Sequence, residues 1–238
     1  MTTTNKFNLN RFALEFRNSK RVTIVGASGS GKTFFGAALT TKISNYAHVP
    51  VLVVDTKREQ KFARVKTFDS VFVNNIAQFS RQKRKIAEIS LNNEVYRDFH
   101  VSEFAAAVCW TMKKSCLYIE EVVEHVGKNS VNFPQTNPLL YKLLQQGRER
   151  GCSLIVATQR VAQLNLSFVD EATDIFVFKI NSREAKFIED SFRLPKNSLD
   201  FTNKKEFSFY HVRSGFDPIL YDPLPKLVLS EKYIEKSE

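Results

Sequence analysis

The sequence is poor in cysteine and has no internal repeat and no long apolar run. Its three cysteines, Cys109, Cys116 and Cys152, are too few and too scattered for a disulfide framework, and none stands at a metal-ligating spacing. Two of them lie in apolar runs and are expected to be buried free thiols, and a reducing cytoplasm is the expected compartment. The N-terminus lacks an apolar signal-peptide core, and no stretch approaches the ~20 apolar residues of a transmembrane helix, so neither is expected.

Acidic residues are outnumbered by basic ones. The 238 residues include 25 Asp and Glu against 35 Lys and Arg, which gives a formal net charge of +10. Hydrophobic residues make up 43%, which excludes a disordered chain and leaves enough apolar material for a core. The positive excess favours a polyanionic partner, with nucleic acid first and an anionic membrane surface second. The alternative interpretation is a merely solvated surface.

Apolar runs rich in β-formers alternate with segments of helical period, which is typical of an α/β protein with a mostly parallel sheet flanked by helices. Strands are expected at 21–25, 51–54, 70–73, 116–119, 154–157 and 175–178. Helices are expected at about 32–44, at 100–114, over the leucine stripe 139–144 and over 185–192. Strands at 207–212 and 218–221 would form a C-terminal β-hairpin. The predicted domains are an N-terminal extension (1–20), one catalytic domain (21–225) and a charged tail (226–238).

The most specific motif matches G-x-x-x-x-G-K-[ST] in full and stands between a predicted strand and a predicted helix. Its residues are Gly26, Ala27, Ser28, Gly29, Ser30, Gly31, Lys32 and Thr33. Glycines let successive backbone N–H groups turn towards phosphate oxygens, and the helix N-terminus adds a favourable dipole. Lys32 would reach the β- and γ-phosphates of ATP, and Thr33 would complete a Mg²⁺ site. The alternative is a Gly/Ser-rich loop that precedes a helix by chance.

A phosphate-binding loop needs an acidic partner, and Glu120 and Glu121 follow the apolar strand 116–119. Glu120 would face the metal, and Glu121 would polarise the attacking water. The pair could instead favour a helix N-terminus by its charge. Gln159 follows another strand and could contact the γ-phosphate or the water, or could simply face solvent. Carboxyl ends of parallel strands line one crevice, where we expect these side chains to meet.

These motifs, with the run Asp55-x-Lys57-x-Glu59, occur in the order seen in FtsK/HerA-type DNA-translocating ATPases. The stretch 147–160, GRERGCSLIVATQR, looks like the family's GR-x-x-G-x-x-L-hydrophobic-x-x-TQR signature. The resemblance covers about residues 20–190 and implies a RecA-like core. The compact, basic chain looks most like the genome-packaging ATPases of double-stranded DNA viruses with an internal membrane. In that setting it would act in the host cytoplasm or at the virion vertex.

The resemblance also implies roles for individual residues. Glu121 would be the catalytic carboxylate, and Gln159 the sensor that couples hydrolysis to movement of the strand. Arg148 matches an arginine that can act in trans on a neighbouring subunit's nucleotide, and Arg150 is the competing choice. Either arginine could instead offset the dipole at a helix C-terminus. The family usually has Asp where Glu120 stands, and the longer side chain puts the metal geometry in doubt.

DNA would be gripped through phosphates rather than read by sequence. The basic run 81–85 supplies candidate contacts from Arg81, Lys83, Arg84 and Lys85, although such runs are often solvated faces. An arginine acting in trans implies a homo-oligomeric ring, expected to be a pentamer or hexamer, and packaging implies a capsid vertex or portal partner.

Three rival functions stay open. A small-molecule P-loop kinase would phosphorylate an acceptor and ignore DNA. A minimal conjugation-type or helicase-type pump would share the motor but not the capsid. A non-catalytic assembly factor would bind nucleotide without turning it over. The absence of LSGGQ, NKxD, HExxH and GxSxG motifs disfavours transporter cassettes, GTPases, zinc proteases and serine hydrolases.

Overall fold

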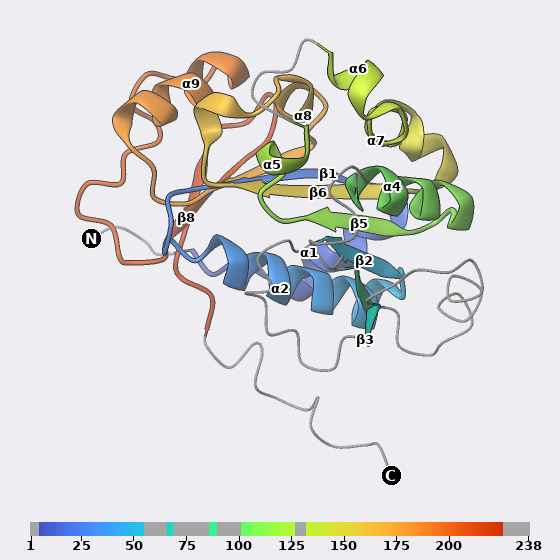
Figure 1. Cartoon of the computed structure of the whole chain (residues 1–238). Coiled ribbons are helices and arrows are strands. Elements are labelled where there is room, and N and C mark those ends of the chain that lie inside the picture. Colours follow the sequence, from blue (N-terminus) through green and yellow to red (C-terminus); the bar gives the residue numbers. More distant parts are fainter. Residues whose placement is uncertain (1–4, 55–65, 69–85, 90–100, 127–131, 226–238) are drawn as a thin grey trace.

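The computed structural model of the chain describes residues 5–54, 66–68, 86–89, 101–126 and 132–225 (Figure 1). Three sequence predictions lie outside these residues. They are the strand at 70–73, the Asp55-x-Lys57-x-Glu59 run and the basic run 81–85 with its candidate DNA contacts Arg81, Lys83, Arg84 and Lys85.

Within the described residues, the strands form one nine-stranded sheet in the order β3-β4-β2-β5-β6-β1-β7-β8-β9. The strands are β1 Arg21–Val25, β2 Val51–Val54, β3 Lys66–Phe68, β4 Ile86–Ile89, β5 Cys116–Ile119, β6 Ser153–Thr158, β7 Asp174–Val177, β8 Phe209–Val212 and β9 Ile219–Tyr221. Neighbours from β3 to β7 pair in parallel, and β8 and β9 add antiparallel. The predicted parallel sheet and C-terminal hairpin are therefore confirmed. Strands β3 and β4 were not predicted, because they are short and lie in a segment rich in polar and basic residues.

Helices cover both faces of the sheet. The α-helices are α1 Leu9–Leu14, α2 Lys32–Lys42, α4 Val101–Met112, α5 Val123–Val126, α6 Phe133–Thr136, α7 Pro138–Gln146, α8 Ser167–Asp170 and α9 Ser182–Phe192. Helices α1 and α2 lie on one face and α4 to α9 on the other (Figure 1). None of the helices in the described part of the chain is long and apolar enough to cross a bilayer.

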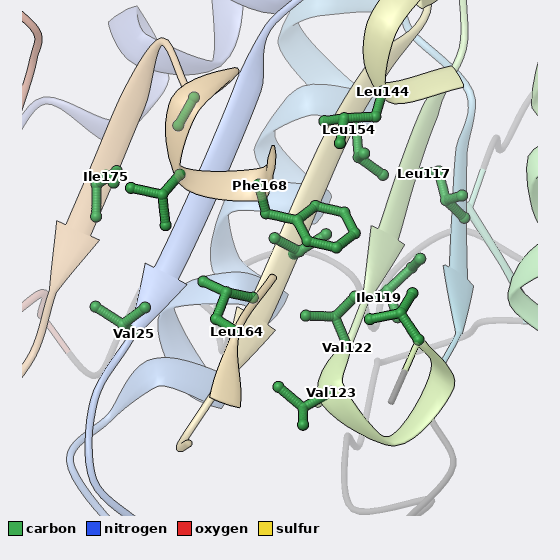
Figure 2. Packing of buried hydrophobic residues seen from close by; sticks show 14 of the residues in the cluster. Val25, Leu117, Ile119, Val122, Val123, Leu144, Leu154, Leu164, Phe168 and Ile175 are labelled. Carbon is green, nitrogen blue, oxygen red and sulfur yellow. The ribbon is translucent and has the colours of Figure 1, made fainter. Parts of the chain in front are cut away.

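Each face of the sheet carries its own hydrophobic cluster, which explains why the central strands are apolar throughout. Along β5, Leu117 and Ile119 point towards α4 to α8, whereas Cys116 and Tyr118 point towards α2. Figure 2 shows part of the first cluster, with Phe168 of α8 packed among side chains of the sheet. All three cysteines are buried and free, one more than the two that the apolar runs predicted.

The segment before β1 packs into the second cluster. Leu9, Phe12 and Phe16 are buried there beside Phe35 of α2 and Phe176 of β7. The ring centroids of Phe12 and Phe176 lie 5.2 Å apart in an edge-on contact, which adds to the hydrophobic gain. The residues assigned to an N-terminal extension therefore contribute to the core, while the domain boundaries themselves stay a prediction.

Arg21 is fully buried at the start of β1, where it holds the end of α7 against the sheet. Its guanidinium donates to the carbonyls of Leu143 (2.8 Å), Leu144 (2.9 Å) and Cys152 (2.7 Å). Burial lowers the pKa of Arg21 to about 10, with a further contribution from the charge of Arg148. The side chain stays charged at neutral pH and donates to carbonyls from both the end of α7 and the start of β6.

Asp174, at the start of β7, is a buried carboxylate with four hydrogen-bond partners. Its Oδ1 accepts from Arg213 Nε (2.6 Å) and contacts His211 Nε2 (2.8 Å). Its Oδ2 accepts from Lys20 Nζ (2.9 Å) and Thr173 Oγ1 (2.8 Å). Burial alone would raise the pKa of Asp174, but the hydrogen bonds from His211 and Lys20 outweigh it and hold the pKa well below its usual range.

Because the folded-state pKa of Asp174 is lowered, its contribution to stability is present above about pH 4 and is lost as the pH falls further. We expect Asp174→Asn to lower the free energy of unfolding at neutral pH by about 3 kcal/mol, since Lys20 and Arg213 lose their buried partner. The variant should also lose less stability than the wild type between about pH 6 and about pH 3. Urea denaturation across this pH range measures both effects.

Asp217→Asn is the matched control, because Asp217 is exposed in the β8–β9 turn. It should change the unfolding free energy by less than about 0.5 kcal/mol. Equal acid sensitivity of the Asp174 variant and the wild type would contradict this account of the cluster.

Candidate nucleotide site

The phosphate-binding loop joins the end of β1 to the start of α2 and is fastened to two neighbouring strands. The N–H of Gly26 donates to the carbonyl of Thr158 (3.3 Å) at the end of β6, and the N–H of Ala27 donates to that of Lys179 (2.8 Å) just beyond β7. A Cβ at Gly26 would lie 2.6 Å from Phe178 Cβ, so a side chain does not fit there. Gly31 has a φ of 100°, which glycine adopts without strain.

The loop keeps polar groups that suit a bound phosphate. Ser30 Oγ is buried and has no hydrogen-bond partner among the residues that the structure describes. Lys32 is only 6% exposed, and its Nζ donates to the carbonyl of Ala27 (3.1 Å). The first N–H groups of α2 face the same loop, and a helix N-terminus attracts anions. The residues at this loop therefore fit a polyphosphate.

Glu120 is joined directly to the phosphate-binding loop. Its Oε1 accepts a hydrogen bond from Thr33 Oγ1 (2.9 Å), and its Oε2 accepts one from the hydroxyl of Tyr118. Tyr118 and Glu120 are two residues apart and follow the alternation of β5 towards α2. A hydroxyl and a carboxylate side by side are oxygen ligands that Mg²⁺ accepts. Sequence reasoning missed Tyr118, although the two-residue spacing could have indicated it.

Glu121 is turned away from Glu120 by its own backbone. Its φ is 48°, a left-handed value that is uncommon for a residue other than glycine. Its Oε1 accepts from Thr158 Oγ1 (2.7 Å), and its Oε2 accepts from the N–H of Gln159 (3.1 Å). The carboxylate is 3% exposed and thereby fixed at the end of β6. Thr158 was not among the candidate residues, because its hydroxyl becomes relevant only through the register of β5 and β6.

The strand order explains how these groups meet. Strand β6 lies between β1 and β5, so its end stands between the phosphate-binding loop and the acidic pair. Lys32, Thr33, Glu120, Glu121 and Gln159 are thus brought to one edge of the sheet, as the motifs indicated. Their individual catalytic roles stay predictions.

The two candidate arginines lie at the opposite edge. Both belong to the turn Gly147–Arg150 before β6, about 20 Å from Gln159 at ~3.3 Å per strand residue. Arg148 is exposed and donates to the carbonyl of Glu171 (3.0 Å). Arg150 donates to the carbonyl of Trp110 (3.1 Å), and its guanidinium lies 4.6 Å from the centre of that ring. Arg148 therefore makes fewer contacts within the chain than Arg150 does. Neither arginine can reach the phosphate-binding loop of its own chain.

No protein-family model matches the sequence, and no curated protein is significantly similar to it in sequence. Solved structures do match. B204, the DNA-packaging ATPase from Sulfolobus turreted icosahedral virus, aligns with a TM-score of 0.67 and 17% identity over 87% of this chain and 100% of its own. The ATPγS complex of the genome-packaging NTPase B204 from Sulfolobus turreted icosahedral virus 2 aligns with a TM-score of 0.66 and 16% identity over 87% and 98%.

The chain has a RecA-like P-loop ATPase fold. VirB4 of Thermoanaerobacter pseudethanolicus also shares it, with a TM-score of 0.59 and 12% identity over 91% of this chain and 92% of its own. At these identities the likeness concerns the fold.

Gly36, inside α2, lets Tyr118 reach Glu120 in this ATPase fold. A Cβ at Gly36 would lie 2.7 Å from Tyr118 Cζ and closer still to its hydroxyl. Replacing Gly by Ala inside a helix normally stabilises by about 1 kcal/mol. We expect the reverse here: Gly36→Ala should lower the unfolding free energy by about 1–3 kcal/mol, because the ring must move and Glu120 loses a partner. Urea denaturation measures the sign.

A double-mutant cycle with Tyr118→Phe supplies the control. Removing the hydroxyl relieves the tightest contact, so the two changes together should cost less than the sum of the single changes. Strict additivity, or a Gly36→Ala variant that is more stable than the wild type, would contradict the proposed clash.

Proposed function

We propose that this chain is an ATP-driven translocase of double-stranded DNA and that it packages a viral genome into a preformed capsid. The proposal rests on the hydrogen bonds of the acidic pair. Glu120 is bonded to Thr33 of the phosphate-binding loop, and Glu121 is bonded to Thr158 and Gln159 at the end of β6. A merely structural acidic pair would not need both the loop and the neighbouring strand.

The chain's own residues account for a hydrolytic site. Lys32 and the loop N–H groups would hold the triphosphate, and Thr33 and Glu120 would hold Mg²⁺. When bound, Mg²⁺ would neutralise charge on the β- and γ-phosphate oxygens. Glu121, fixed by two donors, would accept a hydrogen bond from the attacking water and orient it. The backbone N–H of Gln159 donates to Glu121, so a movement of the carboxylate would displace the end of β6.

The longer side chain of Glu120, where the family usually has Asp, is compatible with this role. Both of its carboxylate oxygens are held, by Thr33 and by Tyr118. Two hydrogen bonds restrict the extra rotamer freedom that a glutamate brings. The contacts with Thr33 and Tyr118 thus accommodate the additional methylene of Glu120.

The likeness of fold to two B204 structures supports the DNA-packaging part of the proposal, because their names describe a DNA-packaging ATPase and a genome-packaging NTPase. The net charge of +10 is consistent with a polyanionic substrate. Double-stranded DNA, a closed ring, a capsid vertex and a site of action in the host cytoplasm all belong to this proposal.

We expect the purified chain to hydrolyse ATP with Mg²⁺ and the rate to rise with duplex DNA. Lys32→Ala should reduce the rate about 100-fold or more, since it removes the positive charge that stabilises the negative charge developing on the phosphate oxygens. Glu121→Gln should reduce turnover by about 100-fold or more while nucleotide still binds, because the amide cannot accept the proton. Phosphate release measures turnover, and calorimetric titration with ATP measures binding.

Lys6→Ala, a change at an exposed lysine outside the phosphate-binding loop and the acidic pair, is the matched control and should leave turnover unchanged. An active chain whose rate ignores DNA in a verified ring would refute the translocase and leave the ATPase. ATP binding without turnover, in wild type and Glu121→Gln alike, would instead favour an assembly factor.

Arg148 can act only on a neighbouring subunit. We therefore expect Arg148→Ala and Glu121→Gln to be inactive alone and to regain activity when mixed. In a mixed ring, a Glu121→Gln subunit would present its intact Arg148 to a site that still has Glu121. Phosphate release as a function of mixing ratio measures this rescue.

Arg11→Ala, a change at an exposed arginine on α1, should stay active and serves as the control. If Arg150 has this role instead, Arg150→Ala rather than Arg148→Ala should be inactive alone and should regain activity when mixed with Glu121→Gln.

A further inference from the structure

Phe207 is a large apolar side chain beside the phosphate-binding loop. Its Cδ1 lies 3.2 Å from where a Cβ on Gly31 would stand, and the residue is 42% exposed. Its φ of 62° is a left-handed value that bulky residues rarely adopt. An exposed aromatic ring on a strained backbone gains little from folding alone, so its position calls for another explanation.

The loop that carries Phe207 is held at several points. The hydroxyl of Tyr210 donates to the carbonyl of Asp200 (2.7 Å), and Lys205 Nζ pairs with Asp222 Oδ1 (2.9 Å). The N–H of Ser208 closes a turn on the carbonyl of Lys205 (3.1 Å). The ring is therefore presented by an anchored segment, which lowers the entropic cost of binding a flat ligand against it.

The register of β7 and β8 places this ring at the nucleotide edge of the sheet. Val177 pairs with Tyr210, so the residues before Phe209 lie next to those that follow β7. Among the latter, Lys179 holds Ala27 of the phosphate-binding loop through its carbonyl. Phe207 thus stands beside Gly31 at the start of α2, while Glu120 reaches the loop from β5, on the other side of β6 and β1.

We propose that Phe207 stacks on the base of the bound nucleotide. This inference rests on the proposed function, because it requires a nucleoside triphosphate whose phosphates occupy the loop. The base must leave the loop on a side away from the acidic pair, and the ring beside Gly31 offers it an apolar face there. Stacking accepts any base, so Phe207 supplies affinity for the nucleoside without choosing between ATP and GTP.

Calorimetric titration of the full chain with ATP, GTP and inorganic tripolyphosphate tests the assignment. Phe207→Ala and Phe207→Leu should both weaken ATP and GTP binding by roughly 5- to 100-fold, because neither side chain has a π face. Phe207→Tyr should restore binding. Tripolyphosphate has no base, so its Kd should be the same in all four proteins.

Phe216→Ala is the matched control, since Phe216 is a more exposed phenylalanine in the β8–β9 turn at the opposite edge. It should bind ATP as the wild type does. Unchanged ATP affinity in Phe207→Leu, or an equal loss for ATP and tripolyphosphate, would overturn the stacking role while leaving the ATPase proposal standing. A wild type that binds none of the three ligands would overturn both the stacking role and the ATPase proposal.

Discussion

Two carboxylates at the end of β5 are buried, and the arrangement of the site depends on how they are satisfied. Glu120 is 8% exposed and Glu121 3%. An ionised carboxylate without partners would cost several kcal/mol in such surroundings. Hydroxyls from Tyr118, Thr33 and Thr158 meet that cost, and they come from three different elements. The position of β6 between β1 and β5 is what makes these contacts geometrically possible.

The same contacts connect the site to the hydrophobic core. Tyr118 belongs to the cluster that contains Phe35 and Phe176, so its hydroxyl is positioned by apolar packing on one side and by Gly36 on the other. A change in the packing of that cluster would displace Tyr118 and, with it, the hydrogen bond from its hydroxyl to Glu120. Stability and the position of Glu120 are therefore coupled at α2, and a substitution that loosens the aromatic packing should affect both.

Much of this could be predicted from the sequence, for physical reasons that differ between elements. The phosphate-binding loop and its two flanking elements are local, so their residues indicate them directly. The acidic pair was predicted because carboxyl ends of parallel strands converge. Thr158 and Tyr118 were missed, because their hydroxyls matter only once the register of β5 with β6 and the packing on α2 are known. The left-handed backbone of Glu121 and Phe207 leaves no trace in residue patterns, since both residue types normally avoid that conformation.

The separation of the two edges of the sheet limits how subunits can assemble. The nucleotide site lies where β1, β5 and β6 end, whereas Arg148 lies where β6 begins. A subunit that offers Arg148 to a neighbour must therefore present its amino edge to that neighbour's carboxyl edge. Such an interface joins two different surfaces, so repeated contacts of this kind build a ring or an open filament rather than a two-fold dimer. A role for Arg148 in trans therefore requires a head-to-tail contact between subunits, and the mixing experiment tests that contact.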